Sequence, residues 1–241
     1  MKVFALGDLH LSFTQSVTKV NLPGVPQHKP MSCFGPGWQD HGVKIFNNWS
    51  RMVDEEDLVL VPGDISWAMK LAETVYDFQY LSLLPGKKVL VQGNHDYWWH
   101  SISKVRSALP DGCYALQNDS FSVPGVTIVG TRGWLTPNNR VFTQHDEKIY
   151  RREIQRLELS LKSMKQRQPV VIAMFHYMPT NQEHQCNELI ELLKQYRVDI
   201  CIYGHLHGAE AHSMRLPARH WGIDFYLTAA DFVHFAPMRI I

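Results

Sequence analysis

The chain has 241 residues, of which 45% are apolar and 20% are charged, and its formal net charge is +1. This length is enough for one large α/β domain with a full hydrophobic core, and we expect residues 1–241 to form a single domain. The near-neutral charge argues against a dedicated nucleic-acid-binding protein, which usually carries a large positive excess.

The cysteines and the apolar stretches bear on the cellular compartment of the protein. Cys33, Cys113, Cys186 and Cys201 lie far apart without a Cys-x-x-Cys pair, which indicates reduced thiols rather than disulfides or a cysteine zinc site. The apolar run at residues 2–6 is too short for a signal peptide, and no apolar stretch approaches the length of a membrane span. The sequence therefore predicts a cytoplasmic protein.

Short continuous apolar runs, rich in Val, Ile and Phe and often ending in Gly, predict β-strands that are covered on both faces. These runs are residues 2–6, 58–61, 88–92, 126–130, 170–175 and 200–203, with further strand-like pieces at 214–216 and 223–228.

Longer amphipathic segments alternate with the strands and predict helices over residues 39–53, 68–83, 101–109, 147–165 and 185–196. The clearest is the fourth, in which an apolar stripe is formed by Ile149, Ile154, Leu157, Leu161 and Met164. Strands alternating with helices indicate an α/β fold.

Residues 12–37 differ from the rest of the chain. Four prolines and three glycines exclude regular structure across this segment. The segment directly follows Asp8 and His10, which are candidate metal ligands, so it should lie over their site. It is expected to be either a lid or substrate wall, or an inert surface loop.

Five polar segments with metal-ligand chemistry each follow a predicted strand. They are Gly7-Asp8-Leu9-His10, Gly63-Asp64, Gly93-Asn94-His95-Asp96, Phe175-His176-Tyr177 and Gly204-His205-Leu206-His207. Their oxygen and imidazole nitrogen donors suit borderline divalent metals. Five such segments in this arrangement predict that the fold gathers metal ions at one edge of a sheet.

In this order, the five segments resemble the signature of the calcineurin-like metallophosphoesterase superfamily: D-x-H, G-D, G-N-H-[DE], H and G-H-x-H. They run from Asp8 to His207 and so span nearly the whole chain. The resemblance implies a four-layer α/β/β/α sandwich, with two mixed β-sheets face to face and helices outside. It also implies two divalent transition metal ions at the carboxyl ends of the central strands.

The resemblance divides seven ligands between the two ions: Asp8, His10 and His207 at the first, Asn94, His176 and His205 at the second, and Asp64 at both. A shared carboxylate offsets the repulsion between two cations that lie about 3.5–4 Å apart. Manganese, iron, zinc and nickel all fit these donors, and the sequence does not choose among them.

Two residues beside Asn94 are assigned other roles. By resemblance, His95 is the catalytic group that meets the phosphate and protonates the leaving oxygen, a task that suits an imidazole with a pKa near the working pH. Asp96 is expected to cap a following helix, with orientation of the ligand segment as the alternative.

Residues around the ligands bear on substrate binding. Aromatic side chains follow the ligand segments, and most should pack between strands and helices, while one or two offer a flat face to a base or apolar leaving group. They are Trp67, Tyr97, Trp98, Trp99 and Trp134. Arg132 is expected either to clamp a phosphate or to form a structural salt bridge. Arg132 and Trp134 are therefore the candidate substrate-binding residues.

The function that these expectations support is hydrolysis of a small phosphomonoester or phosphodiester, in which a metal-bound hydroxide attacks phosphorus. The alternatives are a nucleotide or nucleotide-sugar pyrophosphatase with the same site, and a non-enzymatic protein-binding scaffold with the same fold. The expected partner is a small phosphorylated substrate rather than a membrane or a nucleic acid. The sequence does not indicate an oligomeric state.

Overall fold

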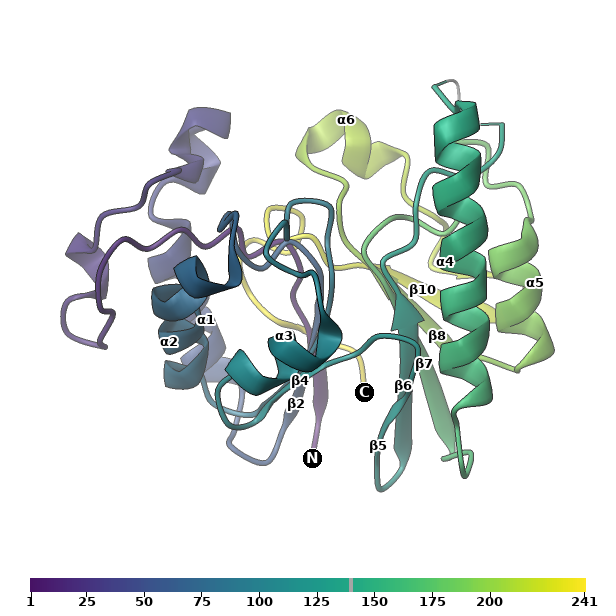
Figure 1. Ribbon diagram of the computed structural model, residues 1–241, viewed down its shortest axis with the longest axis horizontal. Helices are drawn as coiled ribbons and strands as arrows, with labels where there is room; N and C mark the ends of the chain where they lie inside the picture. Colours follow the sequence, from purple (N-terminus) through teal and green to yellow (C-terminus); the bar gives the residue numbers. More distant parts are fainter. Residues whose placement is uncertain (139–140) are drawn as a thin grey trace.

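Two β-sheets lie in the middle of the molecule, between two groups of helices (Figure 1). The structure, a computed structural model, describes residues 1–138 and 141–241. The first sheet has the strand order β11 (Met238–Arg239), β1 (Val3–Ala5), β2 (Leu58–Pro62), β3 (Lys87–Val91) and β4 (Cys113–Ala115). The second has the order β5 (Phe121–Val123), β6 (Val126–Thr131), β7 (Val170–Phe175), β8 (Ile200–Tyr203), β10 (Ile223–Leu227) and β9 (Arg219–His220).

Both sheets are mixed. Strands β1 to β4 run parallel and β11 pairs antiparallel with β1. In the second sheet β6, β7, β8 and β10 are parallel, while the edge strands β5 and β9 are antiparallel. Parallel strands end at the same edge of a sheet, so the segments that follow them meet there.

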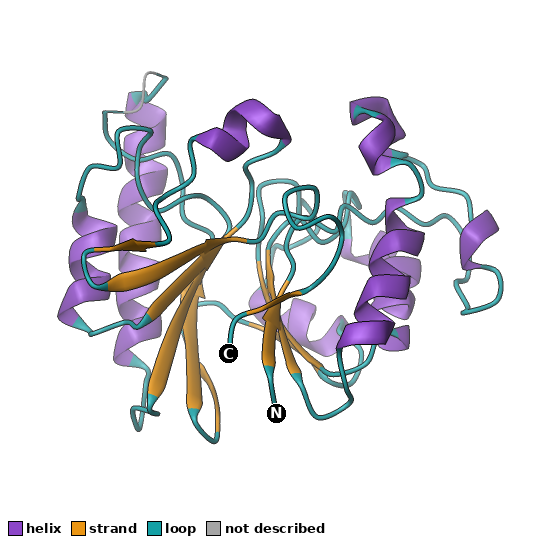
Figure 2. Cartoon of the chain, turned by 180° about the vertical axis from the view of Figure 1, so that it is seen from behind, coloured by secondary structure: helices purple, strands orange, loops and turns teal. Residues whose placement is uncertain are grey.

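Helices cover the outer face of each sheet, as Figure 2 shows from behind. On the first sheet lie α1 (His41–Met52), α2 (Val75–Leu83) and α3 (Ile102–Ala108), and on the second lie α4 (Gln144–Lys162) and α5 (Glu188–Gln195). Between the sheets, Val3, Leu60 and Val89 belong to one buried cluster with Ile128, Ile172 and Ile202. This core explains the continuous apolar strands, and the predicted four-layer sandwich of two mixed sheets is confirmed.

Most predicted elements are confirmed, with small changes at their ends. Helix α4 begins earlier than expected because Thr143 and Asp146 form a capping box, in which each side chain binds the other residue's backbone N–H. The second predicted helix is divided into the 3₁₀ turn Leu71–Thr74 and α2.

The predicted strand at residues 214–216 is wrong. Met214 instead ends the short helix α6 (Gly208–Ser213), and Pro217 then prevents a ladder hydrogen bond. Helix α6 and the short strands β4, β5, β9 and β11 are present in the structure but were not predicted from the sequence.

Residues 12–37 contain 3₁₀ turns at Leu22–Gly24, Met31–Phe34 and Pro36–Trp38, the last of which ends one residue beyond the segment, and no α-helix or regular strand, as their prolines predict. In the described residues, every helix is too short or too polar to span a membrane.

Candidate metal centre

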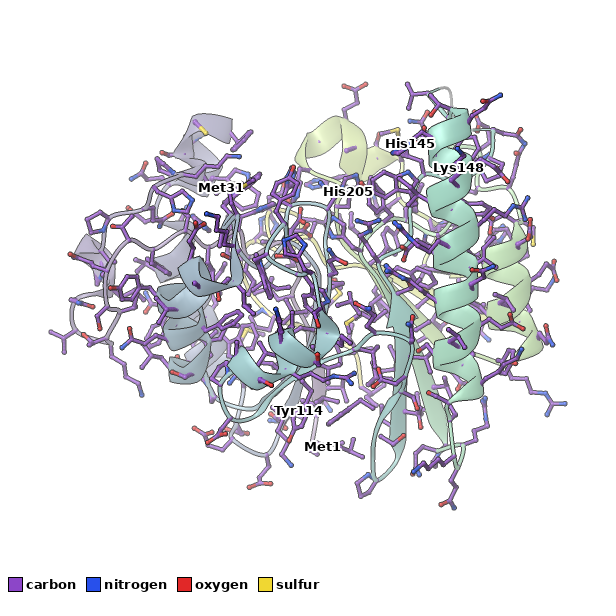
Figure 3. All side chains as sticks on the ribbon, viewed as in Figure 1. Met1, Met31, Tyr114, His145, Lys148 and His205 are labelled. Atoms are coloured by element: carbon purple, nitrogen blue, oxygen red, sulfur yellow. The ribbon has the colours of Figure 1, made fainter. Side chains whose placement is uncertain are left out.

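The predicted ligands gather at one end of the molecule, where the central strands of both sheets finish. Asp8 and His10 follow β1, Asp64 follows β2, and Asn94 follows β3. From the second sheet, His176 follows β7, while His205 and His207 follow β8. Figure 3 shows His205 at this end, which is opposite the end that carries Met1 and Tyr114.

Three donors assigned to the first ion form one compact group. Single ligand atoms of Asp8, His10 and His207 all lie within 4.8 Å of one another. Nε2 of His207 lies 3.5 Å from Nε2 of His10 and 3.4 Å from Oδ1 of Asp8. The structure therefore brings together the residues that the resemblance assigns to the first ion.

A second group adjoins the first. Ligand atoms of Asp8, Asp64 and His176 also lie within 4.8 Å of one another, and Oδ1 of Asn94 lies 2.6 Å from Nε2 of His176. The ring of His205 lies 5.0 Å from that of His176, measured between centroids. The predicted donors of the second ion are thus neighbours as well.

Asp64 lies between the two groups, where its predicted bridging role requires it. Its Oδ2 is 3.8 Å from Nε2 of His10 and 3.5 Å from Nε2 of His176, which are the rings assigned to different ions. Asp8 also belongs to both groups, a proximity that the sequence did not suggest.

The hydrogen bonds of His176 leave its second nitrogen suited to a cation. Nδ1 lies 3.0 Å from the carbonyl oxygen of Pro62, which only accepts, so Nδ1 carries the proton of the neutral ring. Burial lowers the pKa of His176 to about 3, so the ring is neutral at pH 7. Its unprotonated Nε2 and Oδ1 of Asn94 are therefore two electron-pair donors 2.6 Å apart, and a cation bound by both would stabilise this contact.

The surroundings of His207 also favour a positive charge at this site. Burial alone would lower its pKa, but Asp8 and Asp231 outweigh burial and raise the pKa to about 10. Without metal, a proton thus supplies the positive charge that these carboxylates require. A divalent cation can replace that proton, because ligand deprotonation accompanies metal binding.

Asp64 itself is crowded by other acids. Burial, and then the neighbouring carboxylates of Asp96 and Asp8, raise its pKa well above the ordinary value. Buried carboxylates held this close repel one another unless a cation or a proton lies among them. The residues present therefore fit two divalent ions.

The backbone is strained at four of the predicted ligands. Asp8, His10, Asp64 and His205 have φ values of 58°, 46°, 51° and 69°, in the left-handed region that side chains other than glycine rarely adopt. Such conformations each cost about 1–3 kcal/mol and cluster at functional sites. Their concentration at this one edge supports a site selected for ligand placement.

Two glycines allow the ligands to approach the chain closely. A Cβ atom on Gly93 would lie 2.1 Å from Oδ1 of Asp64, and one on Gly204 would lie 2.3 Å from Oδ2 of Asp8. No real side chain tolerates those distances, so both glycines of the sequence motifs are required by contact with a carboxylate.

The expectation that Asp96 caps a helix is wrong. The next helix, α3, begins at Ile102, and Asp96 is instead fully enclosed between two ligand segments. Its Oδ1 accepts from the backbone N–H groups of Ile65 and Ser66, and its Oδ2 accepts from Gly93. Asp96 therefore orients the loops that carry Asp64 and Asn94.

A cavity of about 310 Å³ opens beside the first group of donors. Its walls are formed by His10, Met31, Phe34, Trp38, Trp67, His95, His207, Gly208 and Asp231. Because Met31 and Phe34 belong to residues 12–37, this segment forms part of the cavity wall. We call this space the His95 cavity.

His95, the predicted proton donor, lies beside both Asp64 and the cavity. Its backbone N–H donates to Oδ1 of Asp64 at 2.8 Å, while its half-buried ring packs against Trp67 with 4.2 Å between centroids. Burial, and then the charge of Lys29, lower the pKa of His95. The structure thus puts an imidazole at the boundary between the donors and the cavity.

The two candidate substrate-binding residues have different surroundings. Trp134, together with Tyr177 and His205, lines a second cavity of about 240 Å³. Arg132 lines neither cavity: its guanidinium lies 3.7 Å from the buried carboxylate of Glu153 and 4.6 Å from the Trp134 ring. Of the two readings of Arg132, the structure shows the salt bridge, and its contact with substrate stays a prediction.

Of the aromatic residues that follow the ligand segments, some line a cavity and others are buried. Trp67 lines the His95 cavity, whereas Trp98 and Trp99 are buried and pack against each other. Packing is therefore their main role, as expected.

Asp231 also belongs to this site, although the sequence did not predict it. Its Oδ1 lies 2.8 Å from Nδ1 of His207, and its Oδ2 accepts from the backbone N–H of Gly208 at 2.9 Å. This contact fixes the His207 tautomer that leaves Nε2 free for a metal. The sequence feature that could have indicated Asp231 is its position as a carboxylate shortly after the strand-like piece at residues 223–228.

We expect Asp231→Asn to weaken metal binding by about 10–100-fold, the usual effect of removing a carboxylate behind a metal-ligating histidine. Metal titration followed by calorimetry measures the change. Asp224→Asn, which removes a carboxylate paired with Arg219 on the surface, is the matched control. Equal affinity in the Asp231 variant and the wild type would exclude this orienting role.

The chain is similar to known proteins in its fold and in its sequence family. Among solved structures, the chain is similar to a phosphopantetheinyl hydrolase from Mycobacterium tuberculosis, with a TM-score of 0.52 and 12% identity over 100% of this chain and 95% of that one. It also aligns with AQ665, a protein of unknown function from Aquifex aeolicus, with a TM-score of 0.48 and 15% identity over 99% and 95% of the two chains. No curated protein matches it by sequence. Residues 1–209, however, match the calcineurin-like phosphoesterase family, and the chain belongs to that family.

Proposed function

We propose that the protein is a binuclear metal-dependent hydrolase of small phosphate esters, either monoesters or diesters. The observation that supports this most strongly is the pair of adjoining buried donor groups, which share Asp8 and demand positive charge. The His95 cavity lies directly against them and has room for a small organic group.

The charges of the donors suit an anionic substrate. Only Asp8 and Asp64 among the seven predicted ligands carry negative charge, whereas Asn94 and the four histidines bind as neutral groups. Two divalent ions would therefore leave the site positive and attractive to a phosphate. When bound, such ions polarise phosphoryl oxygens and activate a water molecule at neutral pH.

The protein's own residues then divide the remaining tasks. His95 lies between donors and cavity, where its ring can give a proton to the leaving oxygen. Trp38 and Trp67 offer apolar walls to the leaving group and limit the access of water to it. Asp96 and Asp231 hold the ligand segments and the His207 tautomer in place.

The first experiment is a metal-removal and substrate test. We expect the purified protein to bind up to two transition metal ions per chain, with manganese, iron, zinc and nickel as candidates. Chelation should lower turnover by at least about 10²-fold, because the metal supplies several kcal/mol of transition-state stabilisation, and reloading should restore it.

The reloaded protein is then screened on phosphomonoesters, phosphodiesters, nucleotide pyrophosphates and a phosphopantetheinyl ester, which represents the similar fold from Mycobacterium tuberculosis. Full activity of a metal-free preparation would refute the metal dependence. Metal binding without turnover on any of these classes would favour a protein-binding scaffold instead.

A further inference from the structure

Residues 12–37 bring a cation to the edge of the metal centre. The ammonium of Lys29 lies 3.2 Å from the centroid of the Trp67 ring. On that same indole, the His95 ring packs at 4.2 Å and the His10 ring stacks at 5.0 Å. One tryptophan side chain therefore connects Lys29 with a predicted metal ligand and with the predicted proton donor.

The position of Lys29 is fixed by its backbone. The Ser12 hydroxyl donates to the carbonyl oxygen of Lys29 at 3.1 Å, and the Ser12 carbonyl accepts from the N–H of His28 at 3.0 Å. Ser12 is fully buried and lies two residues after His10. The chain thus holds Lys29 close to the ligand segment, although 18 intervening sequence positions separate Lys29 from His10.

Lys29 also differs from the other cation near the centre. Arg132 is compensated by the buried carboxylate of Glu153. Lys29, which is half-buried, forms no ion pair in the part of the chain that the structure describes. A partly desolvated ammonium without a carboxylate is suited to an anion that arrives from outside the protein.

We propose that Lys29 binds phosphate oxygens of the substrate on the His95 side of the metal centre. The proposal rests on the proposed phosphoesterase function and adds a specificity residue from a segment outside the five ligand motifs. The oxygens belong either to the phosphoryl group that is transferred or to a second phosphate on the leaving group. In the second case, Lys29 favours substrates that carry a further phosphate beside the scissile bond.

The direct test is calorimetric titration of the metal-loaded protein with inorganic phosphate. Lys29→Met should weaken phosphate binding by about 10–100-fold, the usual loss for a hydrogen bond to a charged group. The apolar Met side chain of this variant still covers Trp67, so folding and metal content should not change. Lys29→Arg keeps the charge and should bind phosphate within about threefold of the wild type.

Lys19→Met is the matched control, because it removes the same charge from an exposed position of the same segment. Its phosphate affinity should equal that of the wild type. Unchanged affinity in Lys29→Met, an equal loss in Lys19→Met, or a loss of metal from Lys29→Met would each overturn the proposal.

Turnover then distinguishes the two sources of phosphate oxygen. A similar fall in kcat/KM on nitrophenyl phosphate and on a nucleoside diphosphate places Lys29 at the transferred phosphoryl group. A larger fall on the diphosphate places it at the leaving phosphate. If the wild type hydrolyses none of the substrate classes in the screen described above, the proposed function fails, while the phosphate titration still decides whether Lys29 binds an anion.

Discussion

Asp64→Asn should remove at least one metal ion and lower kcat/KM by at least about 10³-fold, or about 4 kcal/mol of transition-state stabilisation. The reason is the position of the carboxylate, whose Oδ2 lies 3.8 Å from the His10 ring nitrogen and 3.5 Å from that of His176. Metal content measured by elemental analysis, together with steady-state kinetics, tests this.

The same substitution should act in the opposite direction on metal-free stability. Burial, then Asp96 and Asp8, raise the pKa of Asp64 in the folded protein, so its contribution to stability falls as the pH rises above the pKa of the unfolded carboxyl. Asn does not titrate, so the substitution removes this unfavourable contribution. The metal-free variant should therefore unfold at the same temperature as the metal-free wild type or higher, but gain little when metal is added.

Asp77→Asn is the matched control, because Asp77 is another buried acid, and burial raises its pKa to about 7. Asp77 accepts hydrogen bonds from Ser66 and from the backbone N–H of Phe13, and neither of these is a predicted ligand. It should keep both ions. Two ions per chain in Asp64→Asn, with the wild-type rate, would show that the bridging assignment is wrong.

His95→Asn should lower kcat/KM on alkyl phosphates by about 10²–10⁴-fold, the usual contribution of a general acid. An alkoxide is a poor leaving group and needs protonation in the transition state, whereas a nitrophenolate departs unaided. The loss on nitrophenyl esters should therefore be much smaller. Both ester classes are measured with both proteins, and metal is quantified alongside.

Metal content should not change in this variant, since the His95 ring packs on Trp67 and only its backbone contacts Asp64. His100→Asn, at an exposed position shortly after His95, is the control and should have no effect. Equal losses on both ester classes with metal retained would indicate electrostatic stabilisation of the phosphoryl group. A loss that follows metal depletion would refute the assignment of His95 altogether.

The sequence by itself determined the central strands and the chemistry that follows them. Continuous apolar runs such as residues 170–175 and 200–203 form strands that are buried on both faces. Burial on both faces requires apolar side chains at successive positions, and such a run can be recognised in the local sequence. The candidate ligands were also found locally, because each follows its strand within a few positions. Parallel strands then bring such segments together at one edge.

The tertiary structure decided the contacts that support the site. Asp96 was assigned to a helix cap from its neighbours in sequence, yet its partners at Ile65 and Ser66 belong to another loop. The short edge strands, such as β9 and β11, were missed because two residues carry no periodic pattern and depend on the adjoining strand.

Asp231 and Lys29 show that functional residues, too, can escape prediction from the sequence. Each has an ordinary local sequence, and each acquires its role only from a distant partner: His207 for Asp231, and Trp67 with Ser12 for Lys29. A ligand motif is short and repeats a chemical type at fixed spacing, so it can be read along the chain. A carboxylate or an ammonium that orients a ligand or meets a substrate is defined by distance in space, which only the folded chain sets.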